Sequence, residues 1–420
     1  MKVTAELGTD KGKKTFGKTE ASPERLLLAA TGMEAEFSLM IDGRPSRPEA
    51  IFRDPRSFLG DELMHRTGAS YHLGTGGAVY FDTGVIEVAT PAMEIERGCA
   101  ARAGRSLWEG ILEVRRALDQ WGERTRQDAA LVGFSAHYNV SFELPSPSEG
   151  PDRTIEKLAH LLVYILPAPV MLLATNRRSS GVGVRPRGDR IEITVDFTPS
   201  PALMIATGTF IVGVAREVMK WPSFDLSELD RMQIPVFEDF NPIPHTSRSG
   251  WLAHESSFPS SPFTSDVNAQ SLALRDGKTA SLRQVARRIM RRFWHPIRRI
   301  SDPFTFRLIR SVISGQAPSL LDLPDRPVEY EHVGRLCSWD NLFPERELSR
   351  SRYERVLIRA IQKLPLTLDG QWYVPVGMKG WSAVVFKPEN GDGNGRKTVP
   401  IDALTGRLDE WCEPAGHQRA

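Results

Sequence analysis

Four segments of the chain alternate between hydrophobic and polar residues, which is the pattern of a β-strand with one buried face. These segments are centred on Glu34, Tyr80, His137 and Glu192. In each of them the polar residues, mostly acids, Ser, Asn, His or Arg, share one side. Such alternation is typical of an antiparallel sheet with helices packed on its apolar face. The pattern therefore predicts an α+β fold in which the other sheet face is polar and open.

The segment Ala78–Thr90 consists of two strand-like halves separated by a break at Gly84. Asp82 and Glu87 are five residues apart, so on one flat strand they would lie on opposite faces. A turn or bulge at Gly84 would let both carboxylates point to the same side. Two interpretations stay open for these acids and for Tyr80: a solvated sheet face, or a metal and acid–base site.

The remaining long segments repeat hydrophobic residues at helical spacing or are continuously apolar, and a later region returns to strands. Helices are predicted at residues 97–124, 155–173, 202–215, 280–300 and 348–363, with a short one near 58–66. Residues 222–270 are rich in Pro, Ser, Asp and Phe and are predicted to form long loops. We expect three parts: a flexible leader at residues 1–24, a main domain at 25–345, and a small β-rich C-terminal domain at 346–420.

Composition excludes several classes of protein and indicates no particular partner. The 420 residues include 54 Lys and Arg against 52 Asp and Glu, so net charge favours neither a nucleic acid nor a membrane. The three cysteines are isolated, which suits a reducing cytoplasm. The first 18 residues are rich in Lys, Thr and Gly and lack the apolar core of a signal peptide. We therefore expect a cytoplasmic protein, and the two most apolar stretches read as buried helices.

Carboxylates accumulate on the predicted polar face. Glu34 and Glu36 are two positions apart on one strand, which places their side chains about 7 Å apart along the strand. Two like charges that close repel unless water or a cation lies between them. The strand around Glu192 offers a further acid, and also Arg190, on its polar side.

The same face also offers His137 and Asn139, which are suited to a nucleotide phosphate or a metal. A lone His on a strand is also a common structural residue. However, a face of Glu, Asp, Tyr, His, Asn and Arg without Lys differs from the mixture typical of a solvated sheet. Magnesium prefers hard oxygen ligands and accompanies nucleotide phosphates. The sequence thus indicates a cation-and-phosphate site.

Two glycine motifs do not match nucleotide-binding fingerprints, and one basic segment has two possible interpretations. The approach Gly74-Thr-Gly-Gly77 lacks the third glycine of a dinucleotide fingerprint, and Gly277-Lys-Thr279 lacks the earlier glycine of a P-loop. The predicted helix 280–300 carries seven arginines beside an apolar stripe. A basic amphipathic helix binds a nucleic acid, a membrane or an acidic peptide, and a solvated charged face is the alternative.

Two motifs of this chain resemble the Pup ligase and Pup deamidase family. They are Gly32-Met-Glu-Ala-Glu-Phe37 and the segment formed by Val79-Tyr-Phe-Asp82, Gly84 and Glu87-Val-Ala-Thr90. Weaker likenesses are His137-Tyr-Asn139, the strand 191–196 and the segment 274–282, so the resemblance extends over residues 32–293. It implies a glutamine-synthetase-like catalytic domain with a curved antiparallel sheet, and the cofactors ATP and Mg²⁺.

The resemblance also implies roles for individual residues. Glu34, Tyr80 and Glu87 would hold magnesium, and Asp82 would be the catalytic base. ATP binding is assigned to four residues, with two further acids as additional candidates: Thr90, His137, Asn139 and Arg190, then Glu36 and Glu192. The implied activity joins a glutamate-type carboxylate to an amine. The carboxylate donor would be a small acidic ubiquitin-like protein or peptide, docked through helix 280–300.

Two alternatives to the ligase are considered. Glu34 and Asp82 are 48 residues apart, a short connection like that of the ligases, whereas the family's deamidases carry a long insertion there. The first alternative is an ATP-dependent deamidase or isopeptidase at the same site. The second is a non-catalytic nucleotide-binding homologue, because Ala78 stands where the family has an ATP-contacting Arg. The family's nucleotide-stacking Trp is matched by Trp372 or by Trp381.

Overall fold

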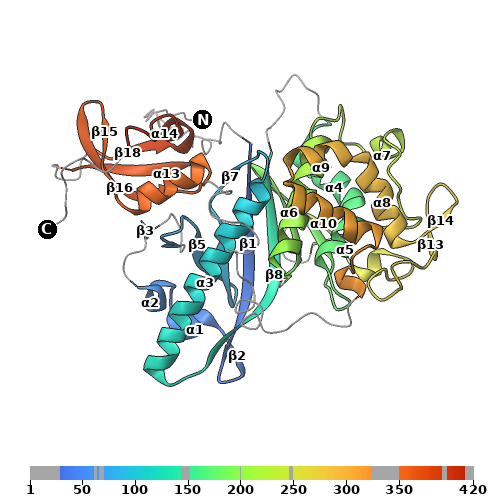
Figure 1. Ribbon diagram of the computed structural model, residues 1–420, viewed down its shortest axis with the longest axis horizontal. Coiled ribbons are helices and arrows are strands. Elements are labelled where there is room, and N and C mark those ends of the chain that lie inside the picture. Colours follow the sequence, from blue (N-terminus) through green and yellow to red (C-terminus); the bar gives the residue numbers. More distant parts are fainter. Residues whose placement is uncertain are drawn as a thin grey trace, which may run out of the picture.

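The computed structural model describes residues 29–60, 64–65, 71–142, 152–198, 200–245, 249–322, 350–389 and 395–411. In this part of the chain one large antiparallel sheet carries helices on one side, and a small four-stranded sheet lies beside it (Figure 1). The expected α+β architecture is confirmed. The predicted leader and the predicted boundary at residue 345 lie outside the described residues.

Strand β1 (Ala30–Ile41) lies in the middle of the twelve-stranded sheet, between β8 (Ala129–Ser141) and β6 (Val85–Ala89). Beyond β8 follow β10 (Arg190–Asp196), β9 (Val182–Arg187), β12 (Trp251–Ala253) and β11 (Ile243–Pro244). Beyond β6 follow β5 (Ala78–Asp82), β4 (Tyr71–His72) and β3 (Met64–His65), while β2 (Arg44–Ser46) and β7 (Met93–Glu94) pair with opposite ends of β1.

The break at Gly84 is the turn of a hairpin between β5 and β6. Thr83 and Gly84 both have positive φ angles, 47° and 100°, as two-residue hairpin turns commonly require. Tyr80 is paired with Glu87 across the hairpin, and Asp82 lies two residues from Tyr80 on the same strand. Directly paired residues and residues two apart share a face, so Asp82 and Glu87 point to the same side, as the sequence predicted.

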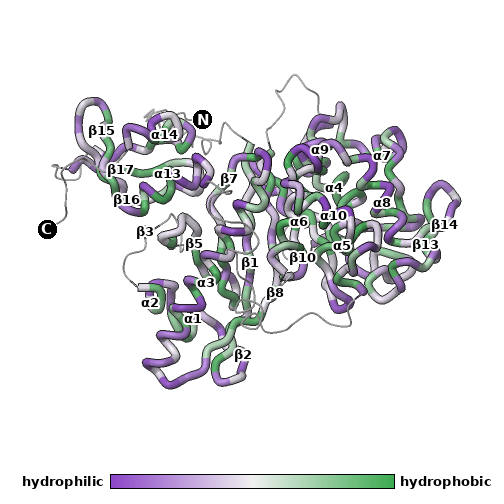
Figure 2. Tube along the Cα trace, viewed as in Figure 1, coloured by the Kyte–Doolittle hydropathy of each residue, from purple (hydrophilic) through white to green (hydrophobic). Residues whose placement is uncertain are grey.

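Helices cover the apolar face of the sheet in two layers. The inner layer consists of α3 (Cys99–Thr125), α4 (Ile155–Ile165), α5 (Pro167–Ala174) and α6 (Pro201–Val218). The outer layer consists of α8 (Leu282–Arg292), α9 (Trp294–Ile300) and α10 (Pro303–Ser314). Hydrophobic residues concentrate where these helices meet one another and the sheet (Figure 2).

Helix α6 lies between the sheet and the outer layer. Gly208 packs against Met33 and Tyr138 on the apolar face of the sheet, and a Cβ at Gly213 would lie 2.9 Å from Ile297 of α9. The helix is long and apolar enough to cross a membrane, but 78% of it is buried within the protein. It is therefore a core helix, as its sequence indicated.

Several predicted elements are shorter or broken. The helix predicted at 155–173 bends by 65° between α4 and α5, where Pro167 begins the second helix. The helix predicted at 280–300 is interrupted at Phe293, because Pro296 cannot donate to the carbonyl of residue 292. Near 58–66, the described residues form α2 (Arg56–Leu59), which follows α1 (Pro48–Phe52), and then β3. The loops at 222–270 contain α7 (Ser227–Arg231), β11, β12 and η2 (Glu255–Ser257). Downstream lie the paired strands β13 (Leu272–Ala273) and β14 (Thr279–Ala280), and η3 (Leu320–Asp322).

The C-terminal region forms a second hydrophobic core. It contains α13 (Arg352–Ile361), β15 (Leu366–Leu368), β16 (Gln371–Lys379), β17 (Ala383–Pro388), β18 (Lys397–Pro400) and α14 (Ile401–Thr405). Ala30 at the start of β1 packs into this core. Glu354 of α13 is fully buried and accepts hydrogen bonds from Arg105 of α3 at 2.9 and 3.2 Å. The small domain is thus fixed to one end of the large sheet.

Candidate active site

The strand register brings the predicted site residues into neighbouring rows on the polar face of the sheet. Glu34 on β1 is paired with His137 on β8, and Glu36 on β1 is paired with Glu87 on β6. Tyr80 on β5 is paired in turn with the same Glu87. On the other side of β8, β10 is paired with it in the same way. Five adjacent strands, β5, β6, β1, β8 and β10, therefore contribute side chains to one polar surface.

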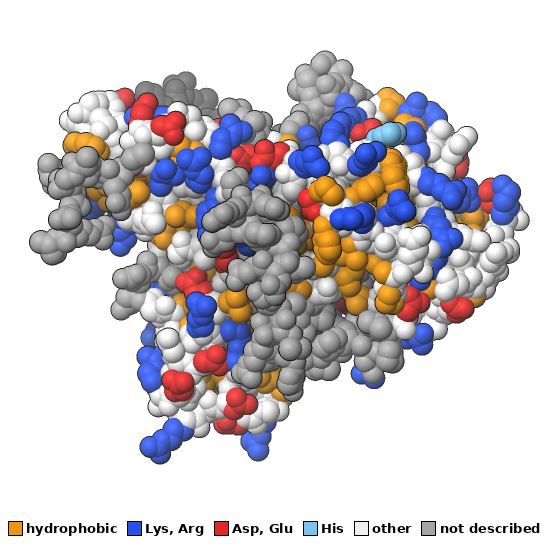
Figure 3. Space-filling model, viewed as in Figure 1, with side chains coloured by type: hydrophobic (Ala, Val, Ile, Leu, Met, Phe, Trp, Pro, Cys, Tyr) orange, Lys and Arg blue, Asp and Glu red, His pale blue; other side chains and the backbone are white. Residues whose placement is uncertain are grey.

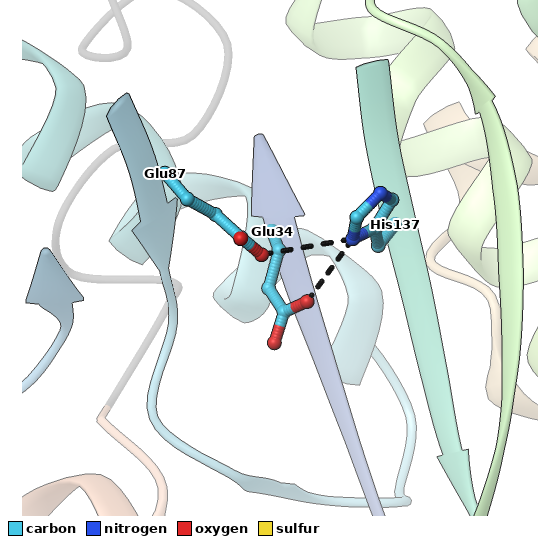
Figure 4. A group of neighbouring side chains, drawn as sticks. All are labelled: Glu34, Glu87 and His137. Carbon is cyan, nitrogen blue, oxygen red and sulfur yellow. Dashed lines mark hydrogen bonds and ion pairs between the residues drawn. The ribbon is translucent and has the colours of Figure 1, made fainter. Parts of the chain in front are cut away.

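The centre of this surface is a cluster of Glu34, Glu87 and His137, with one side chain from each of three strands (Figure 4). The imidazole Nδ1 of His137 lies 3.2 Å from a carboxylate oxygen of Glu34 and 3.6 Å from one of Glu87. The side chain of Glu87 is almost completely buried, with 3% of its surface exposed. One potential ligand atom from each residue lies within 4.8 Å of the other two, close enough to share one metal ion.

A second group of carboxylates shares Glu87 with the first. Glu36, Asp82 and Glu87 also bring ligand atoms within 4.8 Å of one another. Ser135 of β8 donates a hydrogen bond to Glu36 at 2.5 Å, and its hydroxyl lies 3.1 Å from His137 Nε2. Ser135 shares this face because it is paired with Glu36, although the sequence did not assign it to the site. Its role as a connection between Glu36 and His137 emerges only from the pairing of β1 with β8.

Burial and proximity move the pKa values of the central cluster in different directions. Burial alone raises the pKa of Glu34, but the hydrogen bond and charge of His137 and the charge of Arg190 lower it to about 2. Burial and the charge of Glu34 raise the pKa of Glu87 to about 7, against hydrogen bonds from His137 and Tyr80.

Burial disfavours the charged form of His137, but its bonds to Glu34 and Glu87 outweigh this effect and raise its pKa to about 10. A protonated imidazole therefore offsets part of the carboxylate charge when no metal is bound. The cluster has the charge distribution of a site that favours a cation.

A cavity of about 270 Å³ adjoins Glu34 at the end of the sheet nearest the C-terminal domain. Its walls combine three parts of the chain: 30–34 of β1, Thr90, Ala92, Asn139, Ser141, Asp189 and Arg190 from neighbouring segments, and 379–382 from the turn after β16. Three of the four residues predicted to bind ATP therefore line one cavity. The fourth, His137, lies deeper, among the carboxylates.

The predicted ATP-binding residues also make contacts that shape this cavity. Thr90 Oγ1 accepts a hydrogen bond from the backbone N–H of Met33 at 3.0 Å, which holds the chain after β6 against β1. Arg190 Nε donates to Asn139 Oδ1 at 2.9 Å. The guanidinium of Arg190 is thus oriented on the cavity wall, and its charge acts on Glu34.

Glu192 does not join the carboxylate cluster. It is paired with Asn139 on the same face, but it forms ion pairs with two arginines of β9, Arg185 and Arg187, the latter at 3.2 Å. Only 1% of its side chain is exposed. The strand around Glu192 alternates in the same way as the strand around Glu34. The two carboxylates differ only in their neighbours, because arginines of β9 neutralise Glu192.

The residues that the C-terminal domain supplies to the cavity include Lys379, which the sequence did not assign, and Trp381, one of the two candidates for the nucleotide-stacking Trp. The indole of Trp381 packs edge-to-face on His72, with ring centroids 5.1 Å apart. Trp372 is half exposed and does not line the cavity. The two tryptophans could be distinguished only once the position of the small domain was known.

The fold and the site together define the class of this protein. It is an α+β protein with a carboxylate cluster on the open face of an antiparallel sheet. No protein-family model matches the chain, and a search of curated proteins also gives no match. Among solved structures, the chain is similar to the complex between the prokaryotic ubiquitin-like protein Pup and its ligase PafA. That match has a TM-score of 0.50 and 12% identity, and it covers 91% of this chain and 92% of that chain.

A second similar structure is the Pup ligase PafA of the prokaryotic ubiquitin-like modification pathway in complex with ADP. Its TM-score is 0.39 at 12% identity, with coverage of 81% of this chain and 90% of that chain. The first match establishes a Pup-ligase-like fold, as the motifs at residues 32–37 and 79–90 had indicated.

Proposed function

We propose that this protein is an ATP- and Mg²⁺-dependent carboxylate–amine ligase that activates a glutamate-type carboxylate and joins it to an amine. The observation that carries the proposal is a cluster of four carboxylates beside a cavity, in a Pup-ligase-like fold: Glu34, Glu36, Asp82 and Glu87. Such an acidic cluster needs a cation, and a cavity with basic side chains at its edge suits a nucleotide.

Magnesium fits the donor set because the cluster offers carboxylate oxygens, which this hard cation prefers. Glu34 and Glu87 would hold the ion, with the phenol of Tyr80 beside Glu87 as a third oxygen. When bound, the ion would offset the negative charge of the phosphoryl group during its transfer. We infer that the ion takes over the charge-balancing role of protonated His137, which would then face the nucleotide phosphates.

The nucleotide would occupy the cavity between β1 and the C-terminal domain. Arg190 and Lys379 both line this cavity and bring positive charge to it, and Trp381 offers an aromatic surface for the base. Thr90 and Asn139 line the same space and can bond to polar atoms of the nucleotide. Lys379 would thereby supply a charge that Ala78 cannot.

The carboxylate substrate would attack the γ-phosphorus of ATP, which yields an acyl phosphate and ADP. The amine then attacks the acyl carbon, so that the amide bond forms and inorganic phosphate leaves. Since a protonated amine has no lone pair for this attack, a base must remove its proton. Asp82 is half-buried at the turn end of β5, and Ala78 lies at the other end of this strand. We infer that the amine approaches from the turn end.

The carboxylate donor is proposed by analogy with the matched complex, which contains Pup. We infer an acidic ubiquitin-like protein or peptide as the donor, in a cytoplasmic protein organised as a catalytic domain (25–345) and a C-terminal domain (346–420). A deamidase or isopeptidase would use the same residues, and the short Glu34–Asp82 connection favours the ligase.

The proposal is tested by trapping the acyl phosphate. The full-length protein is incubated with MgATP, hydroxylamine and a panel of acidic peptides that end in Glu or Gln. A ligase forms a hydroxamate and ADP with a Glu-terminated peptide, whereas ammonia release from a Gln-terminated peptide indicates a deamidase. If MgATP binds but no peptide stimulates turnover, the ligase proposal fails and a non-catalytic nucleotide-binding protein takes its place.

A further inference from the structure

A second concave surface lies on the outer helix layer, away from the candidate active site. This α9–α10 groove has a volume of about 980 Å³. It is lined by Arg97, Trp294, His295, Arg298, Arg299, Ser301, Asp302, Pro303, Phe306, Arg307 and Arg310. Because α6 packs on the sheet through Gly208 and on α9 through Gly213, a whole helix separates the groove from the sheet. The groove is therefore not a part of the nucleotide cavity.

The rim of the groove is strongly basic. Among the described residues, no ion pair joins Arg298, Arg299 or Arg310 to a carboxylate, and all three are exposed. The one carboxylate in the lining is Asp302, which is engaged as the N-cap of α10 through a bond from the Thr305 N–H at 2.9 Å. The groove therefore presents a net positive charge, because five arginines and a single carboxylate line it.

The floor of the groove is apolar. Trp294 and Phe306 pack edge-to-face with centroids 4.6 Å apart, and both are anchored to the main core. Phe304, one residue from Pro303 on the same helix, is 46% exposed. Figure 3 shows hydrophobic side chains bordered by Lys and Arg over the region of α9 and α10. This combination complements a helix with an apolar stripe and flanking acidic residues.

Two other arginines of the predicted basic helix do not contribute to this surface. Arg283 donates to the carbonyl of Val312, and Arg287 donates to those of Ile313 and Ser314, so both satisfy the C-terminal end of α10. The arginines of the predicted helix 280–300 therefore have two different roles. Its first half stabilises the end of α10, and its second half, together with α10, lines the groove.

We propose that the α9–α10 groove docks an acidic amphipathic helix of a partner protein. A nucleic acid fits less well, because Trp294 and Phe306 are half-buried against each other and do not offer open ring faces to stacked bases. The proposal does not depend on the reaction at the carboxylate cluster, because it concerns binding on the other side of α6.

The test uses a synthetic 20-residue helical peptide with Leu at positions i, i+3, i+4 and i+7 and Glu at most other positions. Binding to the full-length protein is measured by fluorescence anisotropy at 50 and 200 mM salt. We expect saturable binding that weakens with salt. The double variant R298E/R310E should lose at least about tenfold in affinity, and the exposed Arg116→Glu on α3 serves as the matched control.

Three results would overturn the proposal. The first is no saturable binding of the peptide by the wild type, or equal binding by the double variant. The second is a 20-nucleotide single strand that binds more tightly than the peptide and is lost in the same variant. The third is a wild-type dimer that R298E/R310E converts to a monomer, because the groove would then hold a second copy of this chain. MgATP binding, measured in parallel, should be unchanged in every variant.

Discussion

At the scale of single residues, Glu87 is the position on which the candidate site depends most. It belongs to both carboxylate groups and is paired directly with Tyr80 and with Glu36. Its carboxylate also lies 3.6 Å from His137 Nδ1. A change at Glu87 therefore affects every other member of the cluster directly, whereas Glu36 belongs to one group and reaches the other only through His137, whose Nε2 lies 3.6 Å away.

We expect Glu87→Gln to weaken Mg²⁺-dependent ATP binding by at least about tenfold, which corresponds to roughly 1.4 kcal/mol. The amide keeps the volume of the side chain but removes the charge that would attract the ion. Titration calorimetry with ATP in the presence and in the absence of Mg²⁺ measures the change. Glu123→Gln on the exposed end of α3 is the matched control. Equal Mg²⁺ dependence in the variant and the wild type would contradict the metal assignment.

Asp82→Asn separates binding from chemistry. If Asp82 removes the proton of the amine, the variant should bind MgATP normally but form product about 10² to 10⁴ times more slowly, the usual contribution of a general base. The comparison needs the peptide that gives the highest hydroxamate yield with the wild type and a lysine-containing peptide as the amine. A parallel loss of MgATP affinity would instead assign Asp82 to the metal.

At this scale the sequence predicted which side chains share a face but not which ones meet. Alternation alone places Glu34, Glu36, His137 and Glu192 on the polar side, because the pleat has a period of two. The order and register of the strands then decide the outcome: Glu34 is paired with His137, whereas Glu192 is neutralised by arginines of β9. Register depends on long-range pairing, which no local pattern encodes.

At the scale of elements, the β5–β6 hairpin and helix α6 determine how the site is built. The hairpin turn places Asp82 and Glu87 on the same face of neighbouring strands. Gly208 lets α6 approach the sheet closely, and Gly213 lets α9 approach α6. The sequence predicted the turn, because Gly84 interrupts a clear alternation. It did not predict the break at Phe293, because the basic and apolar periodicity continues through it.

Thr83 is a β-branched residue with a φ of 47°, a conformation that costs L-residues roughly 1–2 kcal/mol. Asn tolerates it better and forms the Asn-Gly pair favoured in such turns. We therefore expect Thr83→Asn to increase the free energy of unfolding by up to about 1 kcal/mol, measured by denaturant titration. The opposite variant, Gly84→Ala, places a Cβ at a φ of 100° and should destabilise the protein. If Thr83→Asn also destabilises it, this account of the turn is wrong.

At the scale of the whole molecule, the cavity proposed for the nucleotide exists only because the C-terminal domain is held against the large sheet. The sequence predicted a small β-rich C-terminal domain at residues 346–420, and the described part of this region contains the four strands β15 to β18. The sequence did not predict that Lys379 lines the cavity, nor that Trp381 rather than Trp372 does so, because the docking of two domains leaves no periodic signal in either one.

Glu354 is the main polar contact of this docking. Besides the two bonds from Arg105, it accepts bonds from Arg350 at 2.5 Å and from the backbone N–H of Ser351 at 3.1 Å, and it is fully buried. Removing one partner of a buried ion pair leaves an uncompensated charge and typically costs about 3–5 kcal/mol. We expect Glu354→Gln to loosen the small domain and thereby to weaken ATP binding by tenfold or more.

The matched control is Glu109→Gln, because Glu109 also pairs with Arg105 and Arg350, but near the surface, at 3.6 and 3.3 Å. Exposed ion pairs contribute at most about 1 kcal/mol, so this variant should retain nearly full stability and ATP affinity. Calorimetric titration of ATP and denaturant unfolding are measured on both variants. Reduced stability of Glu354→Gln with unchanged ATP affinity would show that the nucleotide does not bind against the small domain, whereas a joint loss supports a cavity that depends on how the two domains are held together.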